Sequence, residues 1–567
     1  MDKKTKMKFN VFAVFAIIIF CFAITPKTLQ NDTYYTIKIG EHIMQNGIDM
    51  KDPFSWHENL PYTYPHWAYD VAIYQIFNLG ESIGIGGFEA IYLSTVILTM
   101  ILGVLLYYVA VKLCKNNLVA FFVTLGVMYL LKAFVAARAQ LVTYIIFVLE
   151  ILFIEQFLAT KKKRYALGLI ILPIIIANVH LAVWPFYFVL FMPYIAEYLL
   201  AIVTQLDWHY KIAIAWNKHR AKKLSMKKAS KEKIEAATNC VNELQSKLEQ
   251  SVMKREARRE KPYRLILKKQ DSVKWLIVIM IICAFTGLLT PLGDTPYTYL
   301  VKTMQGNTMD NINEHLPLTL INNKNILTVF ALFLAILILT DTKITVRDFF
   351  MLAGLTLLCF MSRRQVSMFV IICGFIFQKL VNRLIDKYDK EGTEKVITTM
   401  TKFLPKVLGI LIVVLVSAYL YKDKVNAAIV NKSSYPVEAS EYIIENLDLD
   451  KIKLYNEYNY GSYLLYRGIP VFIDSRADLY APEFNGKKGE DGKYKGRDIF
   501  TDYINISNLN VYYETKFEEY GFTHIIIRKG AKLNMFLSRN EKYKELYSDK
   551  NFVIYERTTE KIVEENS

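Results

Sequence analysis

The first 25 residues, MDKKTKMKFNVFAVFAIIIFCFAIT (1–25), place a basic start directly before an apolar run that covers residues 10–25. A cleaved secretory leader would end in a small-x-small site, and none follows this run. The stretch therefore predicts an uncleaved first membrane span. Because lysines precede the run, its N-terminal end is expected in the cytoplasm.

Ten further apolar runs follow, and most of them approach the roughly 20 residues that cross a bilayer. They cover residues 88–111, 118–135, 141–159, 166–182, 184–204, 273–290, 325–340, 348–361, 366–380 and 405–421. The runs at 348–361 and 366–380 are the shortest. With the first span, they predict a polytopic α-helical membrane protein of about eleven transmembrane helices.

The charges of the chain are separated from its apolar runs. The sequence is 53% hydrophobic, yet 69 Lys and Arg against 53 Asp and Glu give it a net charge of +16. Such an excess suits either nucleic-acid binding or the basic cytoplasmic loops of a membrane protein. Residues 205–272 alone hold 18 Lys and Arg against 8 Asp and Glu. The excess is therefore a topology signal, and we expect no nucleic-acid partner. The separation also excludes a single soluble enzyme, a disordered chain and a fibrous protein.

The spans and loops divide the chain into parts. Residues 1–421 form the predicted transmembrane domain, with a first outer loop over 26–86 and a basic cytoplasmic helical hairpin over 205–272. The first outer loop is expected to hold two amphipathic helices that lie in the membrane interface. Residues 422–567 carry 22 Lys and Arg against 24 Asp and Glu, which is too polar for lipid. They predict an extracytoplasmic α/β domain, in which IPVFIDSR (469–476) is one of the strand-like runs.

Acidic, histidine and arginine residues gather in the turns that this topology places outside, whereas the cytoplasmic turns carry mostly lysine. A carboxylate can take the proton of an attacking hydroxyl. An arginine is a permanently charged, bidentate donor to phosphate. Both residue types at one membrane face predict a substrate with a lipid-linked phosphate, whose isoprenoid tail lies along the spans. The candidate residues are Asp32, Asp52, His66, Arg138, Asn178, His180, Glu314, Arg363, Arg364, Asp474 and Arg476.

Each of these residues also has a structural explanation. Asp32 stands at a helix start, where an aspartate can cap the helix. Asp52 and Glu314 can serve as turn and loop residues. The arginines of the membrane domain can extend to lipid headgroups, and His180 can bond a neighbouring helix. Asp474 can form a salt bridge within its own domain.

Several ordered motifs resemble those of a known enzyme family. They are Asp32, IKIGEHI (37–43), DPFS (52–55), HW (66–67), ARAQ (137–140), the N-x-H of Asn178 and His180, TPLG (290–293) with Glu314 after it, SRR (362–364) and YNEYNYGSYLLYRGIPVFIDSRADLY (455–480). In these motifs the chain is similar to GT-C glycosyltransferases, integral-membrane enzymes that use polyprenyl-phosphate sugar donors. It looks most like a bacterial branch related to mannosyltransferases, aminoarabinose transferases and oligosaccharyltransferases.

The resemblance implies where the chemistry takes place. The family carries an essential acidic residue in its first outer loop, and the matching residue here is Asp32. Several relatives have a second acidic residue beside it, whereas this chain has Asn31. If a divalent cation such as Mg²⁺ or Mn²⁺ binds, the candidate hard-oxygen ligands are Asp32, Asp52 and Glu314.

We therefore predict an inverting sugar transferase at the outer face of the bacterial plasma membrane. Asp32 is expected to act as general base, with Asp52 and Glu314 as further catalytic candidates. Arg138, Arg363 or Arg364 is expected to hold the departing lipid phosphate. The substrate pocket is expected to be shaped by His66, Asn178, His180 and Glu314, and to be faced from the C-terminal domain by Asp474 and Arg476. The predicted partners are a polyprenyl-phosphate sugar donor, a glycan, lipid or protein acceptor, and membrane lipids.

Other functions are compatible with this pattern. One is a transporter, although transporters usually place polar residues midway through the membrane. Another is a non-catalytic protein of cell-envelope assembly, with the hairpin and the C-terminal domain as docking modules. A ligase that transfers a whole oligosaccharide is the related enzymatic alternative.

Overall fold

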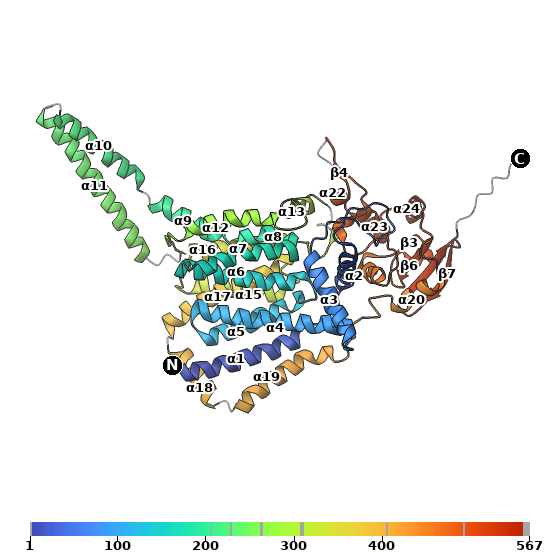
Figure 1. Ribbon diagram of the computed structural model, residues 1–567. Helices are drawn as coiled ribbons and strands as arrows, with labels where there is room; N and C mark the ends of the chain where they lie inside the picture. Colours follow the sequence, from blue (N-terminus) through green and yellow to red (C-terminus); the bar gives the residue numbers. More distant parts are fainter. Residues whose placement is uncertain are drawn as a thin grey trace.

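The computed structural model describes residues 3–205, 207–226, 230–260, 265–306, 311–389, 391–403, 406–490 and 494–558. Figure 1 shows a bundle of helices with a long helical hairpin projecting from one end and a smaller domain with β-strands at the other. The N-terminus lies at the end of the bundle that carries the hairpin.

The bundle helices enclose one continuous apolar core. They are α1 (Lys3–Ile24), α4 (Gly87–Cys114), α5 (Asn117–Leu131), α6 (Ala139–Thr160), α7 (Lys163–Val179), α8 (Trp184–Val189), α9 (Met192–Gln205), α12 (Val273–Phe285), α13 (Thr295–Gln305), α15 (Lys324–Leu339), α16 (Val346–Met361), α17 (Val366–Tyr388), α18 (Gly392–Phe403) and α19 (Lys406–Tyr421). Short 3-10 turns extend or join them at η1 (Lys132–Phe134), η2 (Leu181–Val183), η3 (Thr286–Leu288), η4 (Arg363–Gln365) and η5 (Lys422–Lys424).

The membrane character of the chain is supported by the length and composition of these helices. Six segments of the described residues are long and apolar enough to cross a membrane, and three shorter helices are apolar. The six are Lys3–Ile24, Gly87–Cys114, Asn117–Phe134, Ala139–Thr160, Leu181–Met226 and Arg363–Tyr388. The helix α16 has 16 residues and spans only about 24 Å, less than the bilayer core of about 30 Å. The count of eleven spans therefore stays a prediction.

The run at 366–380, one of the shortest in the sequence, lies in a central helix of the bundle. α17 packs against α4, α5, α6 and α16, and almost all of its first 11 residues are buried. Polar residues after position 380 continue the helix to Tyr388. Because hydropathy alone ends the run at 380, the sequence underestimates the length of this helix.

The first outer loop contains the two expected helices, α2 (Asn31–Asn46) and α3 (Trp67–Ser82), which pack against each other. A Cβ atom on Gly40 would lie 2.2 Å from the backbone oxygen of Asp70, so only glycine permits this close approach. The apolar face of α2 was expected in the membrane interface, but it is buried in protein. Tyr34, for example, packs edge-on against Tyr435 and Tyr463 of the C-terminal domain.

The C-terminal domain is built on a four-stranded sheet of order β3-β6-β8-β7, in which β3 and β6 are parallel and the other pairs antiparallel. Its elements are α20 (Val437–Asn446), β3 (Leu454–Tyr455), α21 (Tyr458–Tyr466), η6 (Ala477–Tyr480), α22 (Pro482–Asn485), β4 (Lys487–Lys488), β5 (Tyr494–Lys495), α23 (Ile499–Asn508), α24 (Tyr513–Tyr520), β6 (His524–Arg528), α25 (Asn534–Leu537), β7 (Tyr543–Ser548) and β8 (Phe552–Arg557).

The strand expected at IPVFIDSR (469–476) is absent, although the structure describes all of these residues. Only Val471 makes a β-bridge, and its partner is Ser55 of the first outer loop. The segment is apolar because it is buried between the loop and the domain, which a strand pattern alone does not distinguish from a sheet.

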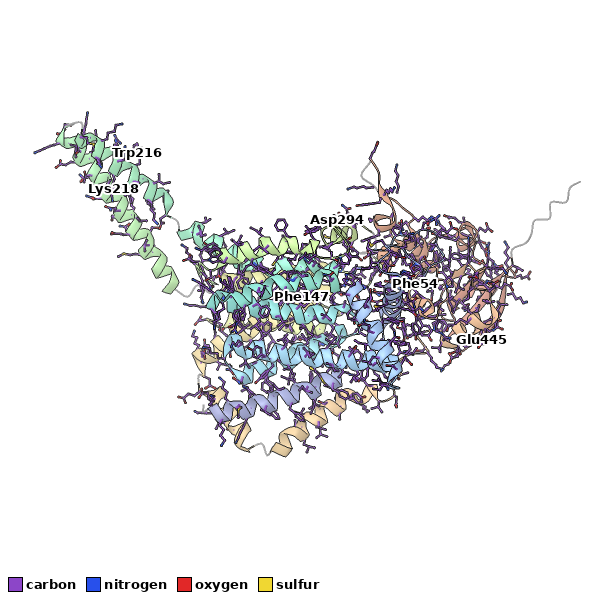
Figure 2. The ribbon with its side chains drawn as sticks, viewed as in Figure 1. Phe54, Phe147, Trp216, Lys218, Asp294 and Glu445 are labelled. Carbon is purple, nitrogen blue, oxygen red and sulfur yellow. The ribbon has the colours of Figure 1, made fainter. Side chains whose placement is uncertain are left out.

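The basic insert forms the expected helical hairpin, with α10 (Trp208–Met226) packed against α11 (Lys231–Glu260). Figure 2 shows it carrying Trp216 and Lys218 away from the bundle. Of the apolar residues along α11, Ala237 and Val241 are buried, whereas Val252 is exposed. The hairpin is followed by β1 (Leu265–Ile266), which pairs in parallel with β2 (Ile344–Thr345) before α16.

Candidate active site

Arg138 joins two acidic residues that lie far apart in the sequence. Its Nη2 lies 2.8 Å from Oδ2 of Asp32, and its Nη1 donates a hydrogen bond to Oε1 of Glu314 at 3.0 Å. Asp32 does not cap its helix, because α2 begins at Asn31 after Gln30 and the Asp32 carboxylate turns to Arg138. Three predicted site residues therefore form one charged cluster around Arg138, and Figure 1 shows α2, the helix of Asp32, beside the C-terminal domain.

The charges in this cluster shift the pKa values of Arg138 and Glu314. Burial acts to lower the pKa of Arg138, but Asp32 and Glu314 outweigh it and raise that pKa above its usual range. Burial likewise acts to raise the pKa of Glu314, but Arg138 and then Arg364 lower it below its ordinary value. Asp32 also stands in the first turn of α2, where the helix dipole favours a negative charge.

The SRR turn holds the segment that carries Glu314. The carbonyl of Glu314 accepts hydrogen bonds from Ser362 Oγ at 3.2 Å and from the backbone N–H of Arg364 at 2.9 Å. The backbone N–H of Arg363 donates to the carbonyl of Leu316 at 3.0 Å. The turn between α16 and α17 thus sets the position of Glu314 beside Arg138.

Arg364 also fixes the ring of His180. Its Nη2 donates to Nε2 of His180 at 3.2 Å, and an arginine side chain has no acceptor atom. The proton of the neutral imidazole therefore resides on Nδ1, which lies 2.9 Å from Oγ1 of Thr143. Thr143 in turn donates to the carbonyl of Ala139 at 3.3 Å. This chain of hydrogen bonds links η4 to the first turn of α6, directly after Arg138.

His66 and Asn178 connect the first outer loop to α7. Nδ1 of His66 lies 3.2 Å from Oδ1 of the fully buried Asp70, and the ring centres of His66 and His180 are 6.3 Å apart. Burial raises the pKa of Asp70. Asn178 accepts a hydrogen bond from Nε1 of Trp67 at 3.2 Å. Asp70 was not among the predicted site residues, although its position four residues after His66 on a helix is a usable signal.

A cavity of about 930 Å³ opens beside the cluster. Basic residues outnumber acidic ones five to one in its lining, which also contains asparagine and glutamine side chains and apolar residues of α5, η1 and α15. Lys132 and Lys324 were not among the predicted site residues, because each is a lone lysine at the outer end of a predicted span. The charged residues of the lining are Lys132, Arg138, Glu314, Lys324, Arg363 and Arg364.

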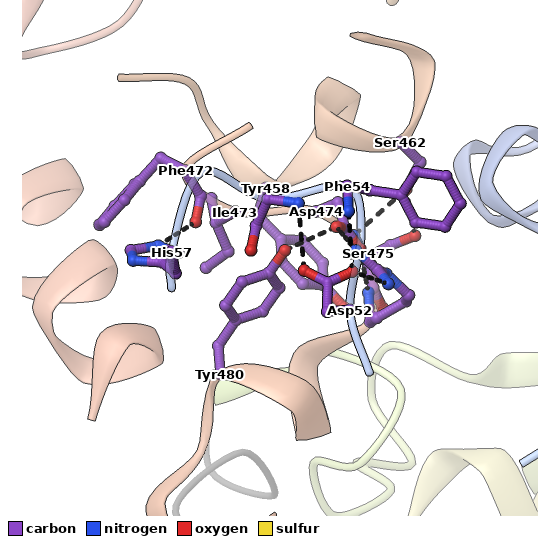
Figure 3. Close-up of polar contacts among 12 residues, drawn as sticks. Asp52, Phe54, His57, Tyr458, Ser462, Phe472, Ile473, Asp474, Ser475 and Tyr480 are labelled. Carbon is purple, nitrogen blue, oxygen red and sulfur yellow. Dashed lines mark hydrogen bonds and ion pairs between the residues drawn. The ribbon is translucent and has the colours of Figure 1, made fainter. Parts of the chain in front are cut away.

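Asp52 and Asp474, which Figure 3 shows near each other, form with Arg476 a separate, buried network that does not line the cavity. Nη1 of Arg476 lies 2.7 Å from Oδ1 of Asp52, and its Nη2 lies 2.6 Å from Oδ2 of Asp474. Tyr480 donates a hydrogen bond to Asp474 at 2.6 Å. Asp52 also accepts the backbone N–H of Ser55 at 3.0 Å. The network fastens the first outer loop to the C-terminal domain.

Replacing Arg476 by Gln is expected to lower the free energy of unfolding by about 3–5 kcal/mol, because two buried carboxylates lose their cationic partner. The measurement is the free energy of unfolding of the purified chain in detergent. The control is Arg467→Gln, whose partly exposed ion pair with Glu441 spans 3.7 Å and is expected to contribute about 1 kcal/mol at most. Equal losses in the two variants would contradict the role of Arg476.

The same pair predicts a pH dependence. Burial acts to raise the pKa of Asp52, but Arg476 outweighs it and holds that pKa below its ordinary value of 3.8. The stabilisation is therefore complete above the ordinary value and is lost as the pH falls through the lower folded-state value. The stability difference between the wild type and Arg476→Gln is expected to shrink below about pH 4.

The three hard-oxygen candidates do not come together as a cation site. Asp52 is paired with Arg476, whereas Asp32 and Glu314 share Arg138. Within the described part of the chain, no group of three or more His, Cys, Asp or Glu side chains could hold a metal ion. This donor set does not fit Mg²⁺ or Mn²⁺, which need several free oxygen ligands.

Comparison with known proteins gives a match at the level of the fold. No family model and no curated protein matches the sequence. Among solved structures, the chain is similar to the oligosaccharyltransferase AglB of Archaeoglobus fulgidus, solved in complex with an inhibitory peptide and a dolichol-phosphate. The TM-score is 0.52 at 12% identity, over 99% of this chain and 75% of that chain. The chain thus has a GT-C-like fold, and its membership of the GT-C superfamily and of any branch within it stays a prediction.

Proposed function

We propose that the chain is a membrane glycosyltransferase that moves a sugar from a polyprenyl-phosphate donor to an acceptor at the outer face of the bacterial plasma membrane. The observation that carries the proposal is the cluster of Asp32, Arg138 and Glu314 beside a cavity with a fivefold excess of basic residues. The fold of AglB, which was solved with a dolichol-phosphate, supports a lipid-phosphate donor in kind.

The cavity suits the phosphate end of such a donor. Arg363 and Arg364 supply fixed guanidinium donors, and Lys132 and Lys324 add charge that offsets the phosphate. The apolar residues contributed by α5 and α15 suit the isoprene units that follow the phosphate. We therefore place the donor in this cavity, with its tail along the bundle.

The reaction is a direct displacement at the anomeric carbon. Asp32 takes the proton of the acceptor hydroxyl as its oxygen forms the new bond to that carbon. The bond between the carbon and the phosphate oxygen breaks with inversion, and its electron pair stays on the lipid phosphate. Arg363 and Arg364 offset the charge that develops there. Glu314 holds the other side of Arg138, so the guanidinium keeps Asp32 in place.

The acceptor approaches from the side of the C-terminal domain. Nδ2 of Asn31, the residue beside Asp32, donates a hydrogen bond to the carbonyl of Tyr458 at 3.0 Å. On the same side, the hydroxyl of Tyr299 in α13 donates to Asp478 at 2.5 Å. We place a glycan, lipid or protein acceptor where these elements meet Asp32.

The test is transfer by the full-length chain in liposomes, with a panel of labelled undecaprenyl-phosphate sugars and envelope extract as acceptor source. The expected result is covalently bound label together with release of undecaprenyl phosphate. Arg363→Gln is expected to weaken donor binding about tenfold or more, whereas Arg164→Gln at the start of α7 leaves it unchanged. Sugar uptake into the liposomes without covalent transfer would contradict the proposal and indicate a transporter.

A further inference from the structure

We propose that the guanidinium of Arg138 takes the place of a divalent cation at this site, so that sugar transfer needs no metal ion. The activity measurement that tests this inference rests on the proposed function, whereas the metal-binding measurement does not depend on the proposed function.

The geometry of Arg138 is the first argument. Asp32 and Glu314 approach neighbouring terminal nitrogens of one guanidinium, at 2.8 and 3.0 Å. The two carboxylates come from segments 282 positions apart in the sequence, and the cation between them is covalently part of the chain. A metal ion that bridged these two carboxylate oxygens would have to displace the guanidinium of Arg138.

The supply of further ligands is the second argument. Mg²⁺ requires close to six oxygen ligands at about 2.0–2.1 Å. Asn31 stands where a second carboxylate would help, but its side chain carries no charge, and its Nδ2 donates a hydrogen bond to the carbonyl of Tyr458. Asp70 is paired with His66, and Asp52 with Arg476. Asp478 accepts the hydroxyl of Tyr299. These three carboxylates are thus already engaged by other side chains.

The balance of charge is the third argument. Glu314 has the guanidinium of Arg138 on its carboxylate, and the charge of Arg364 also lowers its pKa. Two guanidinium groups bring the charge that one divalent ion would bring, and an arginine stays protonated at any working pH. Because this charge cannot be extracted, a chelator has nothing to remove.

The test compares Mn²⁺ binding by the purified full-length wild type with that of two variants that make the same charge change. In Arg138→Glu the introduced carboxylate joins Asp32 and Glu314 around one point. We expect this variant to gain Mn²⁺ binding, seen by electron paramagnetic resonance and as a Mn²⁺-dependent rise in melting temperature. Arg363→Glu, on the SRR turn, and the wild type are expected to show no binding at about 1 mM Mn²⁺.

The wild-type measurements keep the inference falsifiable if Arg138→Glu does not fold. Sub-millimolar Mn²⁺ binding by the wild type would overturn it. So would loss of wild-type transfer in EDTA that Mg²⁺ or Mn²⁺ restores. A folded Arg138→Glu variant that gains no binding would also overturn it, because the guanidinium would then not stand at a cation position. Absence of transfer with every donor would refute the proposed function, while the Mn²⁺ titration would still decide this inference.

Discussion

Replacing Asp32 by Asn is expected to lower the rate of sugar transfer by about 10²–10⁴-fold, the usual contribution of a positioned general base. The amide has nearly the same size, and its oxygen can still accept a hydrogen bond from Nη2 of Arg138, which lies 2.8 Å from the carboxylate. It cannot take up the proton of the acceptor hydroxyl. We therefore expect kcat to fall while donor binding stays within about threefold of the wild type.

The matched control is Glu41→Gln on the same helix. Glu41 pairs with Lys38 at 2.5 Å on a partly exposed face of α2, and its replacement is expected to change kcat by about twofold at most. Melting temperatures of both variants establish that each is folded. An Asp32→Asn variant with more than about one third of the wild-type kcat would remove Asp32 from the role of general base.

That the site residues lie on one side could be predicted, because loops separated by an even number of membrane spans lie at the same membrane face. This rule holds however the helices pack. Asp32, Arg138, Glu314 and Arg364 therefore share a face by counting alone, and the structure brings them together. Which of them touch depends on packing, so the sequence did not show that Arg138 holds both carboxylates.

Asp52 shows the limit of this reasoning. It lies in the same loop as Asp32 and opens a turn that the sequence marks clearly, yet its side chain is fully buried against Arg476. The path of the loop over the C-terminal domain decides the outcome, and it is fixed by contacts such as the bridge from Ser55 to Val471. Local sequence patterns do not specify the route of this loop. Catalysis by Asp52 therefore stays a prediction, and the proposed mechanism does not use it.

The amphipathic face of α2 illustrates a second limit. A helix that packs on protein and one that lies on lipid present the same apolar stripe, because both surroundings exclude water. Here Tyr34 is buried among aromatic rings of the C-terminal domain, including Tyr435 and Tyr463. The consequence for function is direct, since the contact anchors the helix that carries Asp32.

Replacing Arg364 by Lys is expected to be nearly as damaging as replacing it by Gln, with a fall in kcat/KM of about 10²-fold for both. The backbone N–H that holds the carbonyl of Glu314 at 2.9 Å is retained in either variant, so the loss reports on the guanidinium alone. A lysine keeps the charge, but its single nitrogen does not provide the planar set of donors with which a guanidinium binds His180 and a phosphate together. Arg164→Lys, in the first turn of α7 and outside the cavity lining, is the control, with an expected change of about twofold at most.

The hydrogen bonds that link Arg364 through His180 to Thr143 allow a more specific test of this prediction. Thr143→Val removes the hydroxyl that accepts the Nδ1–H of His180, and the imidazole is then free to turn away from Arg364. If the guanidinium acts through this chain, the effects of Thr143→Val and Arg364→Lys on kcat/KM are expected to be non-additive by about 1 kcal/mol or more in a double-mutant cycle. Additive effects, or near wild-type activity in Arg364→Lys, would show that Arg364 acts as a point charge and that the orientation of His180 does not matter for transfer.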